Sequence, residues 1–167
     1  MKKIITLLTA LLLVSNVYGQ TAKEYFNRGN AKYKLQDYRG AIVDYTMAIK
    51  LNPNEAGGYK WRGRAKLKLE DYRGAIADCT KAIELNPNEA DGYIWRSAAK
   101  VKLEDYRGAI ADCTKAIELN PNEAGGYNNR GIAKIFFGQK DSGCLDLSIA
   151  GELGFAEAYE AIKKFCN

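Results

Sequence analysis

Histidine is absent from the 167-residue sequence, which removes the side chain that enzymes use most often as a general base. Its absence also removes a principal zinc ligand, and the four cysteines form no CxxC pattern. The usual residues of hydrolytic or metal chemistry are therefore missing. We expect no catalytic residues, no metal and no cofactor.

A strong excess of one charge is missing as well. The formal net charge is +5, from 25 basic and 20 acidic residues that are mixed along the chain. A nucleic-acid-binding protein would concentrate its basic residues on one face, so nucleic acid is not an expected partner. Hydrophobic residues make up 47% and charged residues 27%, which is typical of a folded domain.

Long hydrophobic runs are also lacking near the N-terminus. Residues 4–14 form an eleven-residue apolar run, whereas a membrane-spanning helix needs about 20 such residues. The run follows Lys2 and Lys3 and precedes a plausible cleavage site at 17–19, which is the pattern of a cleavable signal. We predict a signal peptide at residues 1–19 and export to the periplasm or the medium. After cleavage the protein would have no stable membrane insertion. Its charge would come from 25 − 2 = 23 basic and 20 acidic residues. An uncleaved anchor is the alternative, which the short run disfavours.

What the sequence does contain is a repeat. Residues 68–90 read KLEDYRGAIADCTKAIELNPNEA, and residues 102–124 are identical to them at an offset of 34 residues. A looser copy begins at Lys34 and a degraded one at Phe136. Self-similarity at this period predicts stacked supersecondary units. The predicted units are residues 22–55, 56–89, 90–123 and the degenerate 124–157.

Each unit has the pattern of two amphipathic helices. In the second unit, apolar residues at helical spacing predict a first helix from about Glu55 to Lys68. Asp71 is a suitable N-cap for a second helix that ends near residues 85–86. Gly74 and Gly108 fall inside the predicted second helices. Glycine there lowers helix stability by up to about 1 kcal/mol relative to alanine. Only the close approach of a neighbouring residue would explain both glycines. The sequence therefore predicts an all-α stack of helical hairpins.

The small and aromatic residues of these units resemble the tetratricopeptide repeat (TPR). In the second unit the resemblance rests on Tyr59, Gly63, Ala75, Ala82 and Pro87, and the first and third units carry the same pattern apart from Ser97. The resemblance implies a right-handed superhelical solenoid of antiparallel helix pairs, of an exported bacterial type. It also implies that the first helices line a concave groove that binds extended peptides or protein helices. We further expect residues 155–167 to form a C-terminal capping helix.

Arginine and aspartate recur in register in all four units, as Arg28, Arg62, Arg96 and Arg130 and as Asp44, Asp78, Asp112 and Asp146. An acid/base or anion-binding row is one interpretation. Structural Arg–Asp pairs are the favoured one, because a buried charge without a partner costs several kcal/mol. Whether each pair lies within a unit or between neighbours is left open.

The cysteines are of two kinds. Cys79 and Cys113 hold the same position in two units, where we expect them to act as small hydrophobic residues beyond disulfide reach. Cys144 and Cys166 lie on helices expected to run antiparallel, near the start of one and the end of the other. We predict a disulfide between them, with two unpaired buried thiols as the alternative.

The candidate ligand groove is centred on Trp61 and Trp95, which directly precede two of the repeated arginines and point away from the core tyrosines. If the resemblance holds, this direction is the concave face. The predicted groove residues are Phe26, Asn27, Asn30, Tyr33, Lys34, Lys60, Trp61, Arg64, Lys68, Ile94, Trp95, Lys102, Asn128, Asn129, Ile132 and Phe136. Aromatic rings beside Lys and Arg suit an extended peptide with apolar anchors and some acidic character. The alternative is that both indoles pack between helices.

The family's clamp for a C-terminal carboxylate is not expected here. Asn30 fits that pattern, but Phe26, Trp61, Asp91 and Trp95 stand where Lys, Asn, Lys and Arg would be. The expected function is a non-catalytic scaffold for a protein or peptide partner. An accessory subunit of an envelope-acting enzyme or assembly complex is the second possibility. The sequence predicts neither the identity of the partner nor the oligomeric state.

Overall fold

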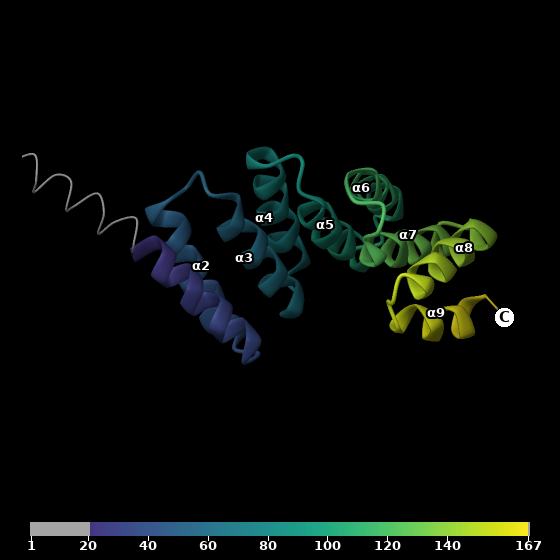
Figure 1. Ribbon diagram of the computed structural model, residues 1–167, viewed down its shortest axis with the longest axis horizontal. Helices are drawn as coiled ribbons and strands as arrows, with labels where there is room; N and C mark the ends of the chain where they lie inside the picture. Colours follow the sequence, from purple (N-terminus) through teal and green to yellow (C-terminus); the bar gives the residue numbers. More distant parts are fainter. Residues whose placement is uncertain (1–20, 167) are drawn as a thin grey trace, which may run out of the picture.

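The computed structural model describes residues 21–166, so the predicted signal peptide lies outside the described residues. The described chain begins with a helix over residues 21–34. The helices that follow are α2 (Tyr38–Leu51), α3 (Ala56–Lys68), α4 (Tyr72–Leu85), α5 (Ala90–Lys102), α6 (Tyr106–Leu119), α7 (Ala124–Phe136), α8 (Lys140–Glu152) and α9 (Glu157–Phe165). No strand occurs within residues 21–166. The predicted all-α solenoid of helix pairs is confirmed (Figure 1).

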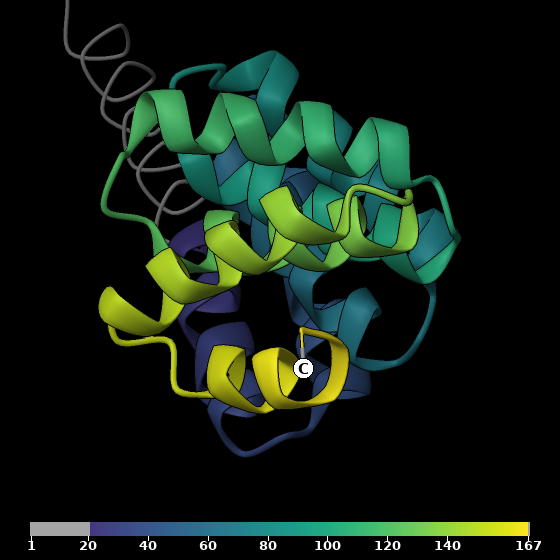
Figure 2. The same ribbon diagram turned by 90° about the vertical axis from the view of Figure 1, so that its right-hand side faces the viewer.

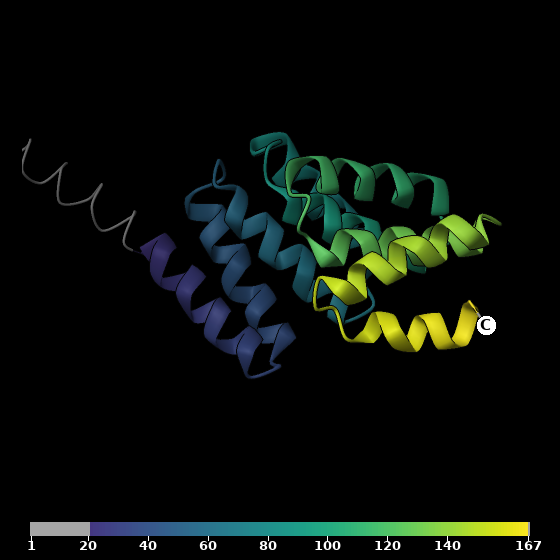
Figure 3. The same cartoon turned by 45° about the vertical axis from the view of Figure 1, so that its right-hand side comes forward.

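The helix pairs form two layers. Among α2–α9, each helix packs against the next along the chain, and the first helices α3, α5, α7 and α9 also contact one another in succession. The second helices α4, α6 and α8 make no such contact with one another. The first helices therefore lie closer together and form the inner layer of a curved stack. The helix of residues 21–34 and α9 lie at opposite ends of it (Figure 3), and successive pairs turn about its long axis (Figure 2).

Aspartate caps set where the second helices begin. The Asp71 carboxylate accepts a hydrogen bond of 2.9 Å from the Gly74 backbone N–H, and Asp105 caps α6 in the same way. Gly74 therefore lies in the first turn of α4, under the capping carboxylate. A Cβ at this position would come 2.1 Å from Asp71 Oδ2. The close contact at Gly74 therefore comes from the capping side chain of its own helix and not from a neighbouring helix.

The turn between the helices of one unit uses a left-handed residue. After α3, the N–H groups of Glu70 and Asp71 donate to the carbonyls of Leu67 and Lys66, which is the hydrogen-bond pattern of a Schellman motif. Glu70 has φ of 63°, and Gln36 and Glu104 adopt the same conformation. Only the fourth unit has glycine here, at Gly138. Non-glycine residues in this conformation are strained.

Replacing Glu70 with glycine should therefore raise the free energy of unfolding by about 0.5–1 kcal/mol, because relief of the left-handed strain outweighs the extra flexibility of the unfolded chain. Chemical denaturation would measure the change. The matched control is Ala77→Gly, at an exposed helical position of α4, which should lower stability by up to about 1 kcal/mol. A Glu70→Gly variant less stable than the parent protein would contradict the strain argument.

Small residues let the two helices of a unit approach closely. Gly63 of α3 faces Cys79 of α4, and a Cβ on Gly63 would lie 2.8 Å from the Cys79 sulfur. Cys79 and Cys113 are buried and unpaired, as predicted. Burial raises the pKa of each thiol to about 12, so both stay protonated at neutral pH. These cysteines are core residues.

The C-terminal helix continues the register of the first helices. Ala158 stands 34 residues after Ala124, which begins α7, and is fully buried. α9 packs against both α8 and α7, the contacts that a first helix makes elsewhere in the stack. A disulfide joins Cys144 of α8 to Cys166, with Cα atoms 5.8 Å apart. The end of the chain is thus held to the fourth unit by packing and by a covalent bond.

Candidate functional site

The repeated aspartates are bound within their own units. In the second unit, Arg62 Nε and Nη2 donate to the two carboxylate oxygens of Asp78 at 2.8 and 2.6 Å. Lys66, one turn after Arg62, places its Nζ 2.8 Å from the same carboxylate. The other three units have the same Arg–Asp–Lys cluster. Because each carboxylate is already bound by two cations, these residues form a structural row and not an acid/base site.

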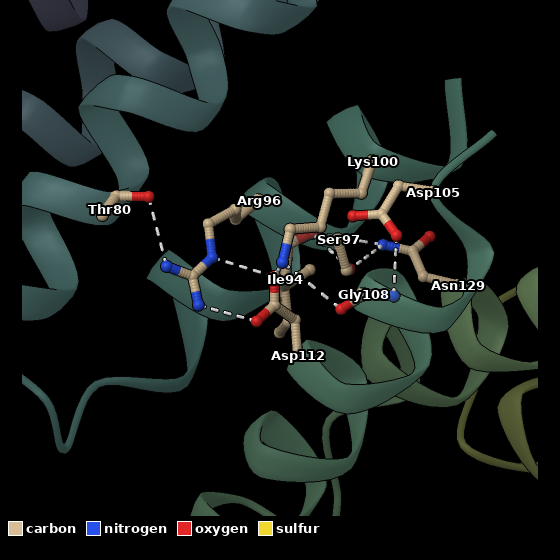
Figure 4. Close-up of polar contacts among 9 residues, drawn as sticks. All are labelled: Thr80, Ile94, Arg96, Ser97, Lys100, Asp105, Gly108, Asp112 and Asn129. Atoms are coloured by element: carbon tan, nitrogen blue, oxygen red, sulfur yellow. Dashed lines mark hydrogen bonds and ion pairs between the residues drawn. The ribbon is translucent and has the colours of Figure 1, made fainter. Parts of the chain in front are cut away.

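The same arginines also join neighbouring units. Arg62 Nη1 donates to Thr46 of the preceding unit at 3.1 Å. Arg96 Nη1 donates to Thr80 at the same distance (Figure 4). Arg28 lies in the first unit, and its side chain is 57% exposed, compared with 17% for Arg62. Its hydrogen bond to Asp44 still lowers the pKa of that carboxyl group, despite the opposing effect of burial. The row therefore stabilises both the hairpins and the stack.

The second and third units differ in sequence mainly in their inner helices. The second helices α4 and α6 are identical, YRGAIADCTKAIEL in both. The first helices α3 and α5 differ at five positions. These are the pairs Gly57 and Asp91, Lys60 and Ile94, Gly63 and Ser97, Arg64 and Ala98, and Leu67 and Val101. Between these two units, the helices differ only in the inner layer.

A cavity of about 640 Å³ opens on the inner side of the first two units. Six of its lining residues belong to the predicted groove and two, Gln36 and Tyr38, do not. The lining residues are Asn30, Tyr33, Lys34, Gln36, Tyr38, Trp61, Arg64 and Lys68. Gln36 belongs to the turn and Tyr38 to the start of α2, so the prediction, which considered only first helices, missed both.

Arg64 lies among three aromatic rings beside this cavity. Its guanidinium carbon is 5.0 Å from the ring centroid of Tyr33, 4.9 Å from that of Trp61 and 4.3 Å from that of Trp95. Trp95 thus joins the site from the third unit. Cation–π contacts of this kind hold a guanidinium in place without neutralising its charge. Trp61 also packs against the core residues Ala41, Tyr45 and Ala65, so its indole is part groove and part core.

Two polar atoms in this cluster have no partner. Arg64 Nε and Tyr33 Oη are buried and make no hydrogen bond to any described residue. Burial raises the pKa of the Tyr33 hydroxyl, although the nearby Arg64 charge opposes the shift. The phenol therefore stays protonated at neutral pH. Buried polar groups without partners are rare in folded proteins, and here two occur beside the same cavity.

Several predicted groove residues serve other contacts. Lys60 forms ion pairs with Glu89, at the end of its own unit, and with Asp91 of the next unit, so its charge is already balanced. Ile94 and Asn128 are buried and present no surface to a ligand. Asn129 donates to the carbonyl of Ile94 and the hydroxyl of Ser97, which ties α7 to α5 (Figure 4). Contacts between neighbouring units occupy these positions, and a projection of one helix does not reveal them.

The remaining predicted residues lie away from the cavity. Phe26 lines a smaller cavity of about 290 Å³ between the helix of residues 21–34, α2 and the start of α3. Ile132 packs against the buried cluster formed by Leu147, Ala150 and Ala158. Phe136 stacks on Tyr106 near the C-terminal end. Asn27 and Lys102 are exposed. The predicted groove residues that do share one cavity therefore lie in the first two units.

Residues 21–166 bring together no group of three or more His, Cys, Asp or Glu side chains that could hold a metal ion. None of its helices is long and apolar enough to cross a membrane.

Known structures match the fold along most of the chain. The Arabidopsis OM64 TPR domain is 31% identical, with a TM-score of 0.69 over 70% of this chain and 97% of that one. The first TPR domain of Spaghetti (RPAP3), solved bound to the HSP90 peptide SRMEEVD, is 27% identical, with a TM-score of 0.70 over 71% and 94% of the two chains. MamA protein is 25% identical, with a TM-score of 0.75 over 86% and 80%.

No curated protein sequence matches the chain. Residues 22–55, 56–89 and 90–123 each match the tetratricopeptide repeat family. Since these matches cover more than half of the 167 residues, the chain belongs to the tetratricopeptide repeat family.

Proposed function

We propose that the protein is a non-catalytic scaffold that binds an extended segment of a protein partner on the inner surface of its first helices. The observation that carries this proposal is the cavity between the first two units, where Trp61 and Tyr33 present aromatic surface beside three cationic side chains. Exposed aromatic and arginine side chains supply most of the binding energy in protein interfaces.

Two further observations support the inner surface as the binding face. Between the second and third units the second helices are identical and only the first helices differ, which favours the inner layer as the source of selectivity. The first TPR domain of Spaghetti (RPAP3), which has a similar fold, binds the HSP90 peptide SRMEEVD. We further propose that binding takes place outside the cytoplasm, in the periplasm or the medium. That location rests on the signal pattern of residues 1–19.

Replacing Trp95 or Trp61 with alanine should weaken capture of a partner from envelope extract by roughly 30-fold, the effect of losing a central aromatic contact. Purified variants immobilised at equal density and probed by quantitative mass spectrometry would measure this. Trp61→Ala should also lower the melting temperature, because Trp61 packs on the core. Trp95→Ala is therefore the more selective test.

The control is Val43→Ser, at an exposed apolar position of the second-helix layer, which should leave capture unchanged. Capture that survives both tryptophan substitutions but is lost with Val43→Ser would place the binding face on the outer layer and overturn the proposal.

A further inference from the structure

Arg64 differs from the other arginines of the described chain. Arg28, Arg62, Arg96 and Arg130 are each bound by an aspartate. Arg39, Arg73 and Arg107 are exposed to solvent. Arg64 alone is partly buried and forms no ion pair with any residue in 21–166. A partly buried guanidinium without an anion is costly, which suggests that its partner comes from another molecule.

Arg64 also departs from the repeat. The equivalent positions of the other units hold Asn30, Ala98 and Ile132, so no common packing role requires arginine there. Tyr33, Trp61 and Trp95 surround the guanidinium and fix its orientation. An arginine held in this way loses little side-chain entropy when it binds a planar carboxylate with two parallel hydrogen bonds.

The charge of the cavity favours an acidic ligand. Its lining includes Lys34, Arg64 and Lys68 and contains no aspartate or glutamate. The side-chain oxygen of Asn30, another lining residue, already accepts a hydrogen bond from Tyr45 Oη, which leaves the Asn30 amide nitrogen as a donor toward a ligand. The Tyr33 hydroxyl, without a partner, is a further donor. Donors and cations therefore outnumber acceptors at this place.

We propose that Arg64, within its cage of Tyr33, Trp61 and Trp95, is a subsite for the side-chain carboxylate of an aspartate or glutamate in an extended partner segment. The inference rests on the proposed peptide-binding function and specifies its ligand chemistry. A carboxylate within the segment is favoured over a chain terminus because the cations are spread over two helices. Lys34 lies on the helix of residues 21–34 and Lys68 lies one turn beyond Arg64 on α3, which suits successive acidic residues along a strand.

The test is selection from a library of random nonapeptides, displayed between fixed sequences so that no peptide has a free C-terminus. Selection is carried out in parallel on the mature wild-type protein and on Arg64→Gln. The wild-type pool should be enriched in Asp or Glu beside an aromatic or aliphatic residue, and the Arg64→Gln pool should lose enrichment at one acidic position. The best wild-type peptide, labelled with fluorescein, should bind Arg64→Gln at least roughly tenfold more weakly by anisotropy.

Arg73→Gln is the matched control, because it removes the same charge from an exposed position of α4 and should leave affinity unchanged. Equal acidic enrichment on wild type and Arg64→Gln would overturn the subsite while leaving peptide binding intact. Enrichment only in a second library that displays free C-termini would assign the site to a chain end and also overturn the proposal. A failure to enrich any peptide on the wild type would count against the proposed function itself.

Discussion

Arg62→Leu is expected to lower the free energy of unfolding by about 3 kcal/mol, because the buried Asp78 carboxylate loses the bidentate member of its two cationic partners. Asp78 is 5% exposed and would keep only Lys66 as a counter-charge. The substitution also removes the hydrogen bond to Thr46, which links the first two units. Urea denaturation followed by circular dichroism would measure the loss.

A double variant separates the charge effect from simple loss of packing. The double variant Arg62→Leu with Asp78→Ala should recover part of the loss, because the buried carboxylate that lost its arginine is removed as well. Arg73→Leu, an exposed arginine on the next helix, should change stability by less than about 0.5 kcal/mol. Strict additivity of the two substitutions at Arg62 and Asp78 would mean that the pair does not interact.

The second large effect concerns the C-terminal disulfide. Cys144→Ser with Cys166→Ser should lower stability by about 3 kcal/mol, the chain-entropy estimate for a loop of 22 residues. In a repeat protein each unit contacts only its neighbours, so the loss should appear first as faster amide exchange in α9. Hydrogen exchange with mass spectrometry would localise it.

Cys79 and Cys113 provide the internal control, because they are unpaired and buried. Protein produced with its own N-terminal segment in an exporting host should show two thiols after denaturation and four only after reduction. Four free thiols without reduction would contradict the disulfide. They would also count against an oxidising compartment as the protein's destination.

The sequence predicted the helices closely because the signals that end them repeat with the units. Asp71 caps α4 as predicted, and the predicted first helix differs from α3 by one residue at its start. The Arg–Asp pairing was predicted as a class, but the choice between pairs within a unit and between units needed the structure. The lysines that join each pair were missed, although Lys66 and its equivalents recur at the same 34-residue spacing and could have been found.

The candidate site was harder to predict than the fold. Tyr33, Trp61 and Arg64, three of the predicted groove residues, line one cavity. Lys60 and Ile94 share the predicted face, but Lys60 is paired with Glu89 and with Asp91 of the next unit, and Ile94 is buried. How much of a first helix stays accessible to a ligand depends on the rotation from one unit to the next. That rotation is set by packing across many residues and leaves no local signal.

The identity of residues 68–90 and 102–124 gives the stack a property of its own, since unequal recombination between the two segments would add or remove 34 residues without creating a new junction. Loss of residues 68–101 would leave Arg62 facing Asp112 at the spacing it now has to Asp78, because α6 repeats the sequence of α4. The hairpin interface would survive, while Trp95 and its contact with Arg64 would disappear. Identical outer helices thus allow the length and the chemistry of the inner surface to change in whole units while each hairpin keeps its internal pairing.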